Sequence, residues 1–345
     1  IVDLGRHRSG PSGHRLLTGP MHQALESCLL SGGQAILFIN RRGFAPSVHC
    51  TGCGELQQCP ACSVTLTEHR RAGALLCHYC GFSTPDNDRC LYCGGSELER
   101  TGIGTEKLED ALKQCVADIR VARLDRDTAV GEGVERVLDR LRRQEIDVLV
   151  GTQMVTKGHD IPGVTLVGVM LADQSLAFPD FRAAERTFQL LAQVAGRAGR
   201  GGKAGLVLVQ SYQPDHYAVR AASAHDYATF YRQEVGARGE LGYPPFARLV
   251  AVRVDAGGEN QARRAIEQLA ASVASHPKVR DRTVRLMGPA PAPIARLRGR
   301  FRFRLLLRSS DRQALRSVAA RIAERIEQGL APAHASLDVD PVSML

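Results

Sequence analysis

The pattern of apolar and polar positions divides the first two thirds of the chain into alternating strands and helices. Apolar residues recur at helical spacing over residues 18–31, 105–117, 132–143 and 182–195, which predicts amphipathic helices. Short apolar runs predict buried strands over residues 35–39, 119–124, 148–150, 164–171 and 205–210. Strands that alternate with helices are typical of a parallel sheet covered on both faces, so we expect an α/β domain.

A different order begins near residue 212. Strands are expected over residues 247–255, 282–287, 300–308 and 335–340, and helices over residues 259–275 and 310–328. This βαββαβ order predicts a small α+β domain over residues 212–345. The α/β domain would comprise residues 1–44 and 100–211, because residues 45–99 interrupt its alternation with cysteines, glycines and turns.

The interrupting segment contains eight of the ten cysteines of the chain. They form four C-x-x-C pairs: Cys50/Cys53, Cys59/Cys62, Cys77/Cys80 and Cys90/Cys93. One tight turn presents both thiolates of such a pair to a metal about 2.3 Å away, and two turns complete a closed tetrahedral site. The segment is therefore predicted to bind two structural Zn²⁺ ions, which would supply most of its folding energy.

Four cysteine pairs can be combined into two sites in three ways. The fourteen residues between the two inner pairs suit a single ribbon, and the outer pairs would then close around its base. His49, His69 and His78 lie nearby, but eight thiolates already fill two sites, so we expect none of these histidines to be a ligand. Cys28 and Cys115 stand alone in helical patterns and are expected to be core residues.

The composition narrows the class of protein. Hydrophobic residues make up 44% of the 345 positions, which is ordinary for globular domains. No leader segment opens the chain and no apolar run approaches the roughly 18 residues of a membrane helix, so we expect a cytoplasmic protein without a membrane partner. Because the chain begins with Ile1 and a polar connector, we expect it to be part of a longer protein.

The chain is basic. Its formal charge is +9, and Arg outnumbers Lys by 40 to 5. A positive charge is compatible with a nucleic-acid backbone as partner, although a GC-rich genome alone would also explain the excess of arginine.

Two segments carry candidate motor chemistry. Residues 151–154 (GTQM) and 157–160 (KGHD) directly follow the expected strand 148–150, and the carboxyl end of a parallel strand is where α/β sheets bind ligands. An ordinary strand-to-loop turn is the alternative. Arg197 and Arg200 follow the expected helix 182–195, and their spacing suits two guanidiniums that meet a transferring phosphoryl group. A solvated basic helix end is the alternative there.

The α+β domain contains a second basic segment, with five arginines within residues 296–304. If residues 300–304 form a strand, its arginines share one face and Phe301 and Phe303 share the other. Arg298, Arg300 and Arg302 are therefore candidate contacts to a DNA backbone. A solubilising outer face over a buried sheet is the alternative.

These segments together resemble motifs V and VI of superfamily-2 helicases, and residues 38–44 (FINRRGF) resemble motif IV. With the cysteine block between Phe44 and Gly104, the chain closely resembles the PriA family of bacterial replication-restart proteins (primosomal protein N′). Residues 125–128 (DRDT), 180–186 (DFRAAER) and 338–341 (DVDP) match as well. The resemblance covers essentially the whole chain, and the arginine-rich composition suggests an actinobacterial type of member.

The resemblance implies a second RecA-like helicase lobe with a two-zinc insertion, followed by a small α+β DNA-binding domain. It implies one zinc on Cys50, Cys53, Cys90 and Cys93, and another on Cys59, Cys62, Cys77 and Cys80. It further implies arginine fingers at Arg197 and Arg200, nucleotide contacts at Gly158, Asp160 and Gln193, and DNA contacts at Thr152, Gln153 and Lys157.

The function that the resemblance implies is replication restart at stalled or abandoned forks. Expected partners are forked and single-stranded DNA, primosome and helicase-loading proteins, and single-strand-binding protein. ATP and Mg²⁺ would bind between this lobe and a first lobe upstream, because the chain has no G-x-x-x-x-G-K-[ST] loop and no acidic box. This chain alone is then not expected to hydrolyse ATP.

Two hypotheses remain for the parent protein: an ATP-driven 3′→5′ DNA helicase, or a fork-binding scaffold that loads partners without hydrolysis. A zinc-ribbon transcription or repair factor would leave residues 148–200 unexplained.

Overall fold

The computed structural model describes most of the chain and forms two compact units. It describes residues 1–344 except 8–9, 11–12, 14–16, 40–46, 51–52, 54–56, 61–65, 70–72, 77–81, 86–88, 97, 102–104, 125–132, 153–160, 162, 178–179 and 200–203. The first unit comprises residues 1–45, 102–178 and 183–234, and the second comprises residues 46–101, 179–182 and 235–345.

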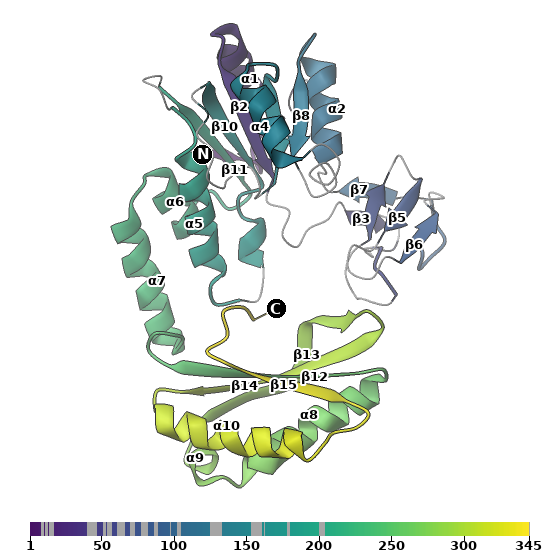
Figure 1. Ribbon diagram of the computed structural model, residues 1–345, viewed down its shortest axis with the longest axis vertical. Helices are drawn as coiled ribbons and strands as arrows, with labels where there is room; N and C mark the ends of the chain where they lie inside the picture. Colours follow the sequence, from purple (N-terminus) through teal and green to yellow (C-terminus); the bar gives the residue numbers. More distant parts are fainter. Residues whose placement is uncertain are drawn as a thin grey trace. The chain divides into compact units, whose positions relative to one another are not determined.

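The first unit is built on a six-stranded parallel sheet with the order β1-β11-β10-β2-β9-β8 (Figure 1). The strands are β1 (Val2–Asp3), β2 (Gln34–Ile39), β8 (Val121–Leu124), β9 (Val148–Gly151), β10 (Val164–Met170) and β11 (Leu206–Ser211). Its helices are α1 (Gly19–Leu30), α2 (Thr105–Cys115), α4 (Val134–Arg142), α5 (Ala183–Ala195) and α6 (Tyr217–Ser223), with the short 3₁₀ helix η3 (Gln174–Ala177). Helix α7 (Tyr227–Leu241) belongs to this unit as far as Glu234. The predicted α/β architecture is confirmed.

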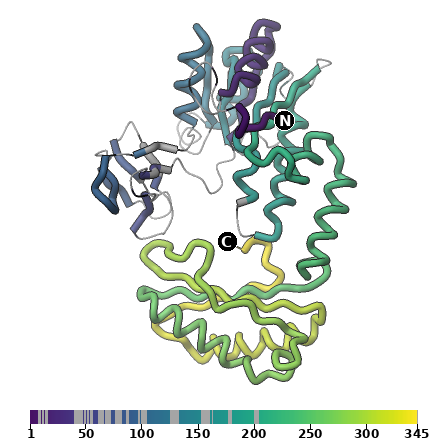
Figure 2. Tube along the Cα trace, turned by 180° about the vertical axis from the view of Figure 1, so that it is seen from behind, coloured from purple at the N-terminus to yellow at the C-terminus, as the bar shows by residue number. Residues whose placement is uncertain are grey.

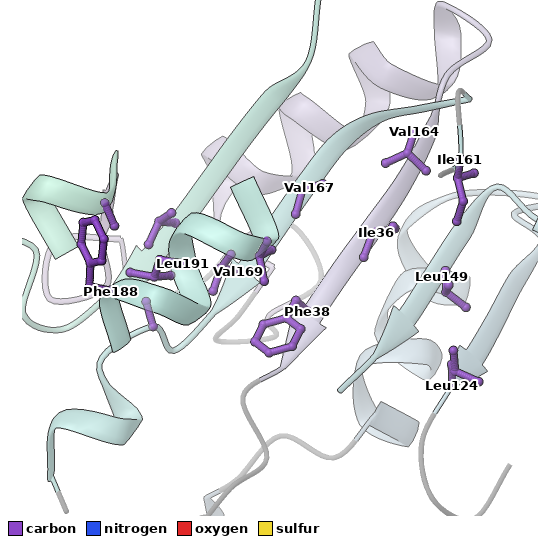
Figure 3. Packing of buried hydrophobic residues seen from close by; sticks show 14 of the residues in the cluster. Ile36, Phe38, Leu124, Leu149, Ile161, Val164, Val167, Val169, Phe188 and Leu191 are labelled. Atoms are coloured by element: carbon purple, nitrogen blue, oxygen red, sulfur yellow. The ribbon is translucent and has the colours of Figure 1, made fainter. Parts of the chain in front are cut away.

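The two faces of this sheet are covered by different helices. In β2, Ala35, Leu37 and Ile39 pack with α1 and α2, whereas Ile36 and Phe38 pack with α4 and α5. Figure 3 shows the second of these clusters, in which Phe38 lies near valines of β10 and Phe188 of α5 lies further along the same layer. Alternate residues therefore fill two separate layers, as the two-residue period of a strand requires.

The structure adds elements that the apolar pattern did not indicate. The sequence predicts a polar connector at the start of the chain, but Val2 and Asp3 pair in parallel with β11 and so extend the sheet. Helices α6 and α7 follow the last predicted strand of the α/β domain. Phe230 of α7 stacks on Phe188 of α5 with centroids 4.2 Å apart, so the helical layer continues past residue 211.

The cysteine-rich segment folds around a small antiparallel sheet. Its order is β6-β5-β4-β3-β7. The strands are β3 (Ser47–Cys50), β4 (Thr67–His69), β5 (Ala74–Leu76), β6 (Ser83–Pro85) and β7 (Leu98–Thr101). Among the described residues of this segment, the buried cluster consists of Val48, Cys59, Leu66 and Leu75. So small an apolar cluster is typical of domains that depend on a metal for stability.

The remaining part of the second unit is a four-stranded antiparallel sheet covered by helices on one face (Figures 1 and 2). The elements are β12 (Arg248–Ala256), α8 (Glu259–Ala274), α9 (Pro277–Arg280), β13 (Arg285–Leu297), β14 (Arg300–Ser309), α10 (Arg312–Glu327) and β15 (His334–Val339). The sheet order is β13-β14-β12-β15. The expected βαββαβ order is confirmed, with the short α9 added and with β13 continuing to Leu297 rather than ending at residue 287.

The three-domain division expected from the sequence, with limits at residues 44, 99 and 211, stays a proposal beside this two-unit description. Among the described helices, none combines the length and apolarity needed to cross a membrane.

Candidate metal centre, motor motifs and basic strand

The outer cysteine pairs meet at one point beside the small antiparallel sheet. The sulfurs of Cys50, Cys53, Cys90 and Cys93 all lie within 4.8 Å of one another. Cys50 Sγ is 3.7 Å from Cys93 Sγ, and Cys53 Sγ is 3.7 Å from Cys90 Sγ. Four sulfurs bound tetrahedrally to zinc at about 2.3 Å lie about 3.8 Å apart. The four thiols thus fit a closed zinc site, and the predicted grouping of these four is the one that the structure forms.

The loop that carries Cys90 prepares it to bind a metal. Buried Gln57 donates a hydrogen bond from Nε2 to Cys90 Sγ at 3.2 Å and accepts one at Oε1 from the Leu91 amide at 2.7 Å. Burial raises the pKa of the Cys90 thiol, but hydrogen bonds from the amides of Cys93 and Tyr92 and from Gln57 outweigh it. The result is a pKa lowered to about 6. The thiolate, which is the form that binds metal, is therefore favoured at neutral pH.

The inner cysteine group lies mostly outside the described residues. Of Cys59, Cys62, Cys77 and Cys80, only Cys59 is described, and it is buried against Val48 and Leu66. The second zinc site remains a prediction.

The motif V segment begins at the carboxyl end of the parallel sheet. Gly151 is the last residue of β9 and pairs with Phe38, and the Thr152 amide donates to the carbonyl of Leu124 at 3.3 Å. Thr152 is partly exposed there. Gln153, Lys157, Gly158 and Asp160 lie outside the described residues, so their proposed contacts stay predictions.

The motif VI segment follows α5 at the other end of the sheet. Phe188, Leu191 and Val194 bury one face of α5 in the core, which fixes the direction in which the helix ends. Gln193 is exposed on the last turn and Arg197 is half-buried just beyond it; Arg200 lies outside the described residues.

Two glycines hold the turn after Arg197 against the sheet. The Gly199 amide donates to the carbonyl of Val164, the first residue of β10, at 3.2 Å. A Cβ on Gly205 would lie 2.2 Å from the Gly199 nitrogen, so the two backbones touch. The turn after Arg197 lies at Val164, the amino end of β10, whereas Thr152 lies at the carboxyl end of β9. Strands rise about 3.3 Å per residue, so Thr152 and Arg197 lie at opposite ends of the sheet and are not brought together.

The alternation predicted for the basic strand is confirmed. Phe303 is buried beneath the helices and Phe301 packs beside it, whereas Arg302 and Arg304 pair across the sheet with Asp255 and Arg253 on the open face. The structure therefore separates an apolar and a basic side, as the two-residue period requires.

Several of these arginines already bind protein groups. Arg300 forms an ion pair with Asp255 and donates to its carbonyl, and Arg304 donates to the carbonyl of Met344 at 3.4 Å. Arg298 occupies the tip of the β13–β14 hairpin, where its φ is +51° and that of Gly299 is +76°, and its side chain is exposed. Two central residues with positive φ are typical of the type I′ turn that joins twisted strands.

The apolar and polar pattern missed two features of these sites. Gln57 binds the ligand Cys90 but is not part of a C-x-x-C pair. Nothing in the sequence pattern distinguishes it from its neighbour Gln58, so its role could not be predicted. The carboxy-terminal residues return to the open face of the four-stranded sheet, where the Ser343 carbonyl accepts from Arg253 at 3.1 Å.

Three family models match the chain in order. Residues 59–85 match the PriA DNA helicase Cys-rich region domain, residues 96–202 the helicase conserved C-terminal domain, and residues 239–342 the primosomal protein N C-terminal domain.

Curated relatives match over the whole length of the chain. The replication restart protein PriA of Bacillus subtilis is 38% identical over 349 residues, which is 100% of this chain and 43% of the relative. That of Synechocystis is 41% identical over 351 residues, or 100% of this chain and 41% of the relative. The chain thus spans less than half the length of these relatives.

Among solved structures, the yeast DEAD-box protein Dbp5 bound to RNA and ADP BeF3 is similar over 64% of this chain and 41% of its own. It shares 15% of residues, with a TM-score of 0.32.

Proposed function

The chain belongs to the PriA family of replication restart proteins, and we propose that it supplies a motor lobe, a zinc-binding region and a DNA-binding domain for restart at stalled or abandoned forks. In this proposal it binds forked and single-stranded DNA, remodels the fork, and promotes primosome assembly and loading of the replicative helicase. Its partners would include primosome proteins, helicase-loading proteins and single-strand-binding protein, in the cytoplasm.

One observation carries this proposal. A parallel sheet whose helix α5 is followed by Arg197, a four-cysteine centre, and a βαββαβ domain with a basic face occur in one chain. Relatives match all three together over 100% of its length. A parallel sheet or a zinc site alone would fit many functions.

The motor part of the proposal concerns the parent protein. ATP and Mg²⁺ would bind between this lobe and a first lobe of the parent, with Arg197 and Arg200 facing the transferring phosphoryl group and Gly158, Asp160 and Gln193 near the nucleotide. Thr152, Gln153 and Lys157 would contact the DNA backbone during 3′→5′ unwinding. A fork-binding scaffold without hydrolysis is the second candidate, and the DNA-stimulated ATPase activity of the parent protein separates the two.

The DNA-binding part concerns the tip of the β13–β14 hairpin. Exposed Arg298 at the tip and Arg302 on the open face are the side chains best placed for phosphate, while Arg300 contributes charge beside Asp255. Aromatic residues make up only 5% of the chain, so we expect phosphate charge rather than base stacking to dominate affinity.

The test is binding of the 345-residue chain to a labelled fork, a single strand and a blunt duplex, measured by fluorescence anisotropy over a range of salt concentrations. Replacing Arg298, Arg300 and Arg302 by Ala should weaken fork binding and flatten the slope of log K against log salt by about two to three. A matched control replaces Arg264, Arg312 and Arg316, which are exposed on α8 and α10. Equal slopes for both variants would exclude this face as the DNA site.

A further inference from the structure

A second basic surface of the α+β domain lies on α9 and the residues that lead from it into β13. Four cations fall within residues 278–285, and all four are exposed: Lys278, Arg280, Arg282 and Arg285, which together form the α9 patch. The α9 patch has no part in the metal centre, the motor motifs or the tip of the β13–β14 hairpin.

The charge of the α9 patch is not neutralised by neighbouring acids. Asp281 is the single acid of residues 276–285, and its carboxylate accepts a hydrogen bond from the Thr283 amide at 2.9 Å. Within the described part of the chain, none of the four cations forms a side-chain hydrogen bond or an ion pair. The α9 patch therefore presents its positive charge to solvent.

Other basic side chains of this domain are compensated. Arg248 and Arg253 each form an ion pair with an acid of β15, and Arg263 of α8 pairs with Glu259 one turn before it. Charges of both signs, interspersed in this way, are typical of a surface that serves solubility. The single sign of the α9 patch instead favours an anionic partner.

The backbone beneath the α9 patch is held by the core of the domain. Val284 is buried among the residues under α8 and α10, and Val279 packs against the same cluster. The Val284 amide donates to the Lys278 carbonyl at 2.7 Å, and the Ser309 hydroxyl donates to the Thr283 carbonyl at 2.7 Å. Cations on a fixed backbone lose less conformational entropy on binding than those on a mobile loop.

The α9 patch and the hairpin tip lie at opposite ends of one pair of strands (Figures 1 and 2). Arg285 begins β13 opposite Arg308 of β14, whereas Leu297 ends β13 opposite Arg300. Positions 308 and 300 of β14 are eight steps apart, which at about 3.4 Å per step is about 27 Å. Base pairs of a duplex rise about 3.4 Å each, so about eight of them span this interval.

We propose that the α9 patch is a second contact to the phosphate backbone of duplex DNA, and that one duplex arm reaches from the hairpin tip to α9. Residues 276–285 contain no Phe, Tyr or Trp, so the chemistry of this surface suits phosphate rather than stacked bases. A duplex carries phosphates at regular intervals along its whole length and so reaches both basic surfaces at once. The inference rests on the proposed function and adds a second surface to it.

The experiment compares two stem-loop DNAs, with stems of five and twenty base pairs, by fluorescence anisotropy on the 345-residue chain. The variant combines Lys278→Gln, Arg280→Gln and Arg282→Asn, because residue 282 has φ +63° and Asn tolerates that conformation. It should bind the long stem about ten-fold more weakly, with the slope of log K against log salt flattened by about two to three. The short stem cannot reach both surfaces, so its affinity should fall by about two-fold at most.

Two controls separate a local contact from a general effect of charge. Replacing Arg264, Arg316 and Arg321 by Gln removes as many exposed cations from α8 and α10 and should leave both affinities within about two-fold. Arg280→Lys combined with Arg282→Lys keeps the charge and should bind the long stem as the parent does. A ten-fold loss in either control would overturn the proposal, as would equal losses of the α9 variant on the two stems.

A second measurement uses the unaltered chain. Photo-crosslinking of the twenty-base-pair stem, mapped by mass spectrometry, should label residues 278–285 as well as residues 296–302. Labels confined to residues 296–302 would overturn the proposal.

The outcomes distinguish this inference from the proposed function. A parent chain that binds neither DNA would overturn both. Binding that is weakened by the Arg298, Arg300 and Arg302 variant but not by the α9 variant would overturn this inference alone. If a polyglutamate peptide binds the parent as tightly as the long stem and loses that binding in the α9 variant, the partner is an acidic protein segment and not DNA.

Discussion

The side-chain amide of Gln57 donates a hydrogen bond to the sulfur of Cys90 at 3.2 Å while its carbonyl oxygen accepts from the amide of Leu91. Gln57 thereby fixes both the ligand and the turn that carries it. Partners of this kind typically change metal affinity by about 10- to 100-fold when removed. We expect Gln57→Leu, which keeps the buried volume, to weaken zinc binding by that order in a competition titration with a chromophoric chelator.

The neighbouring Gln58 provides the matched control for that experiment. It is partly exposed and forms no described hydrogen bond to a cysteine, so Gln58→Leu should bind zinc as the parent does. Equal affinities for both variants would show that Gln57 has no influence on the metal.

The metal content follows from the number of thiolates. Reduced, freshly purified protein should contain about two zinc ions per chain by elemental analysis, because eight thiolates make two closed sites. Cys90→Ser and Cys59→Ser should each lose about one ion while the parallel sheet keeps its secondary structure in circular dichroism. A parental content near one would contradict the second site.

The β13–β14 turn predicts opposite effects at two adjacent positions. Arg298 has φ +51°, a backbone conformation that is unfavourable for residues other than Asn and Gly. Arg298→Asn should therefore raise the free energy of unfolding by about 0.5 to 1 kcal/mol. Gly299 has φ +76°, and a Cβ at this position would meet open space, so Gly299→Ala should destabilise by about 1 kcal/mol through conformation alone. Urea unfolding followed by circular dichroism measures both, and effects of the same sign would refute this turn geometry.

Asp147 predicts a pH dependence of stability. Its carboxylate accepts from the Arg120 side chain and amide, at 3.0 and 2.8 Å from Oδ2, and this lowers its pKa below the ordinary value near 4. Because the pKa of Asp147 is lower in the folded than in the unfolded protein, its ionised carboxylate stabilises the fold at pH values above the unfolded-state pKa. This stabilisation is lost as the pH falls through the folded-state pKa.

Asp147→Asn should therefore lower the free energy of unfolding by about 1 kcal/mol near pH 7, a figure reduced because Arg120 is half-exposed and solvent screens its charge. The loss should become progressively smaller below about pH 4. Asp139→Asn, which removes an exposed ion pair within α4, is the control and should have a smaller effect at pH 7. Urea unfolding at pH 7 and pH 3 measures both variants. A cost for Asp147→Asn that stays constant between these values would exclude the carboxylate as its source.

The parent protein provides the test of motor function. If it hydrolyses ATP, Arg200→Ala should lower DNA-stimulated kcat by about 10³- to 10⁵-fold with a smaller effect on nucleotide affinity, since an arginine finger acts in the transition state. Arg186→Ala, on α5 but outside motif VI, is the control. Equal ATPase rates for Arg200→Ala and the parent would show that Arg200 does not act as an arginine finger. A parent without ATPase activity would favour the fork-binding scaffold.

Local chemistry allowed much of this protein to be predicted from its sequence. Successive residues of a strand point to opposite faces, so an apolar run such as residues 35–39 predicts a core layer on each face. Ala35, Leu37 and Ile39 fill one layer, and Ile36 and Phe38 fill the other. The C-x-x-C spacing likewise predicts which cysteines share a turn. The period of β14 predicts which arginines share a face, because all three patterns depend on neighbours a few residues away.

Only the tertiary structure decided which distant groups meet. Cys50 lies beside Cys93, Arg300 binds Asp255, and Phe181 stacks on Tyr243 across intervals of 43, 45 and 62 residues. Helices α6 and α7 escaped prediction for the same reason, since α7 has little apolar periodicity of its own and buries Phe230 against α5. Such contacts depend on how whole elements pack, and no spacing within one segment contains that information.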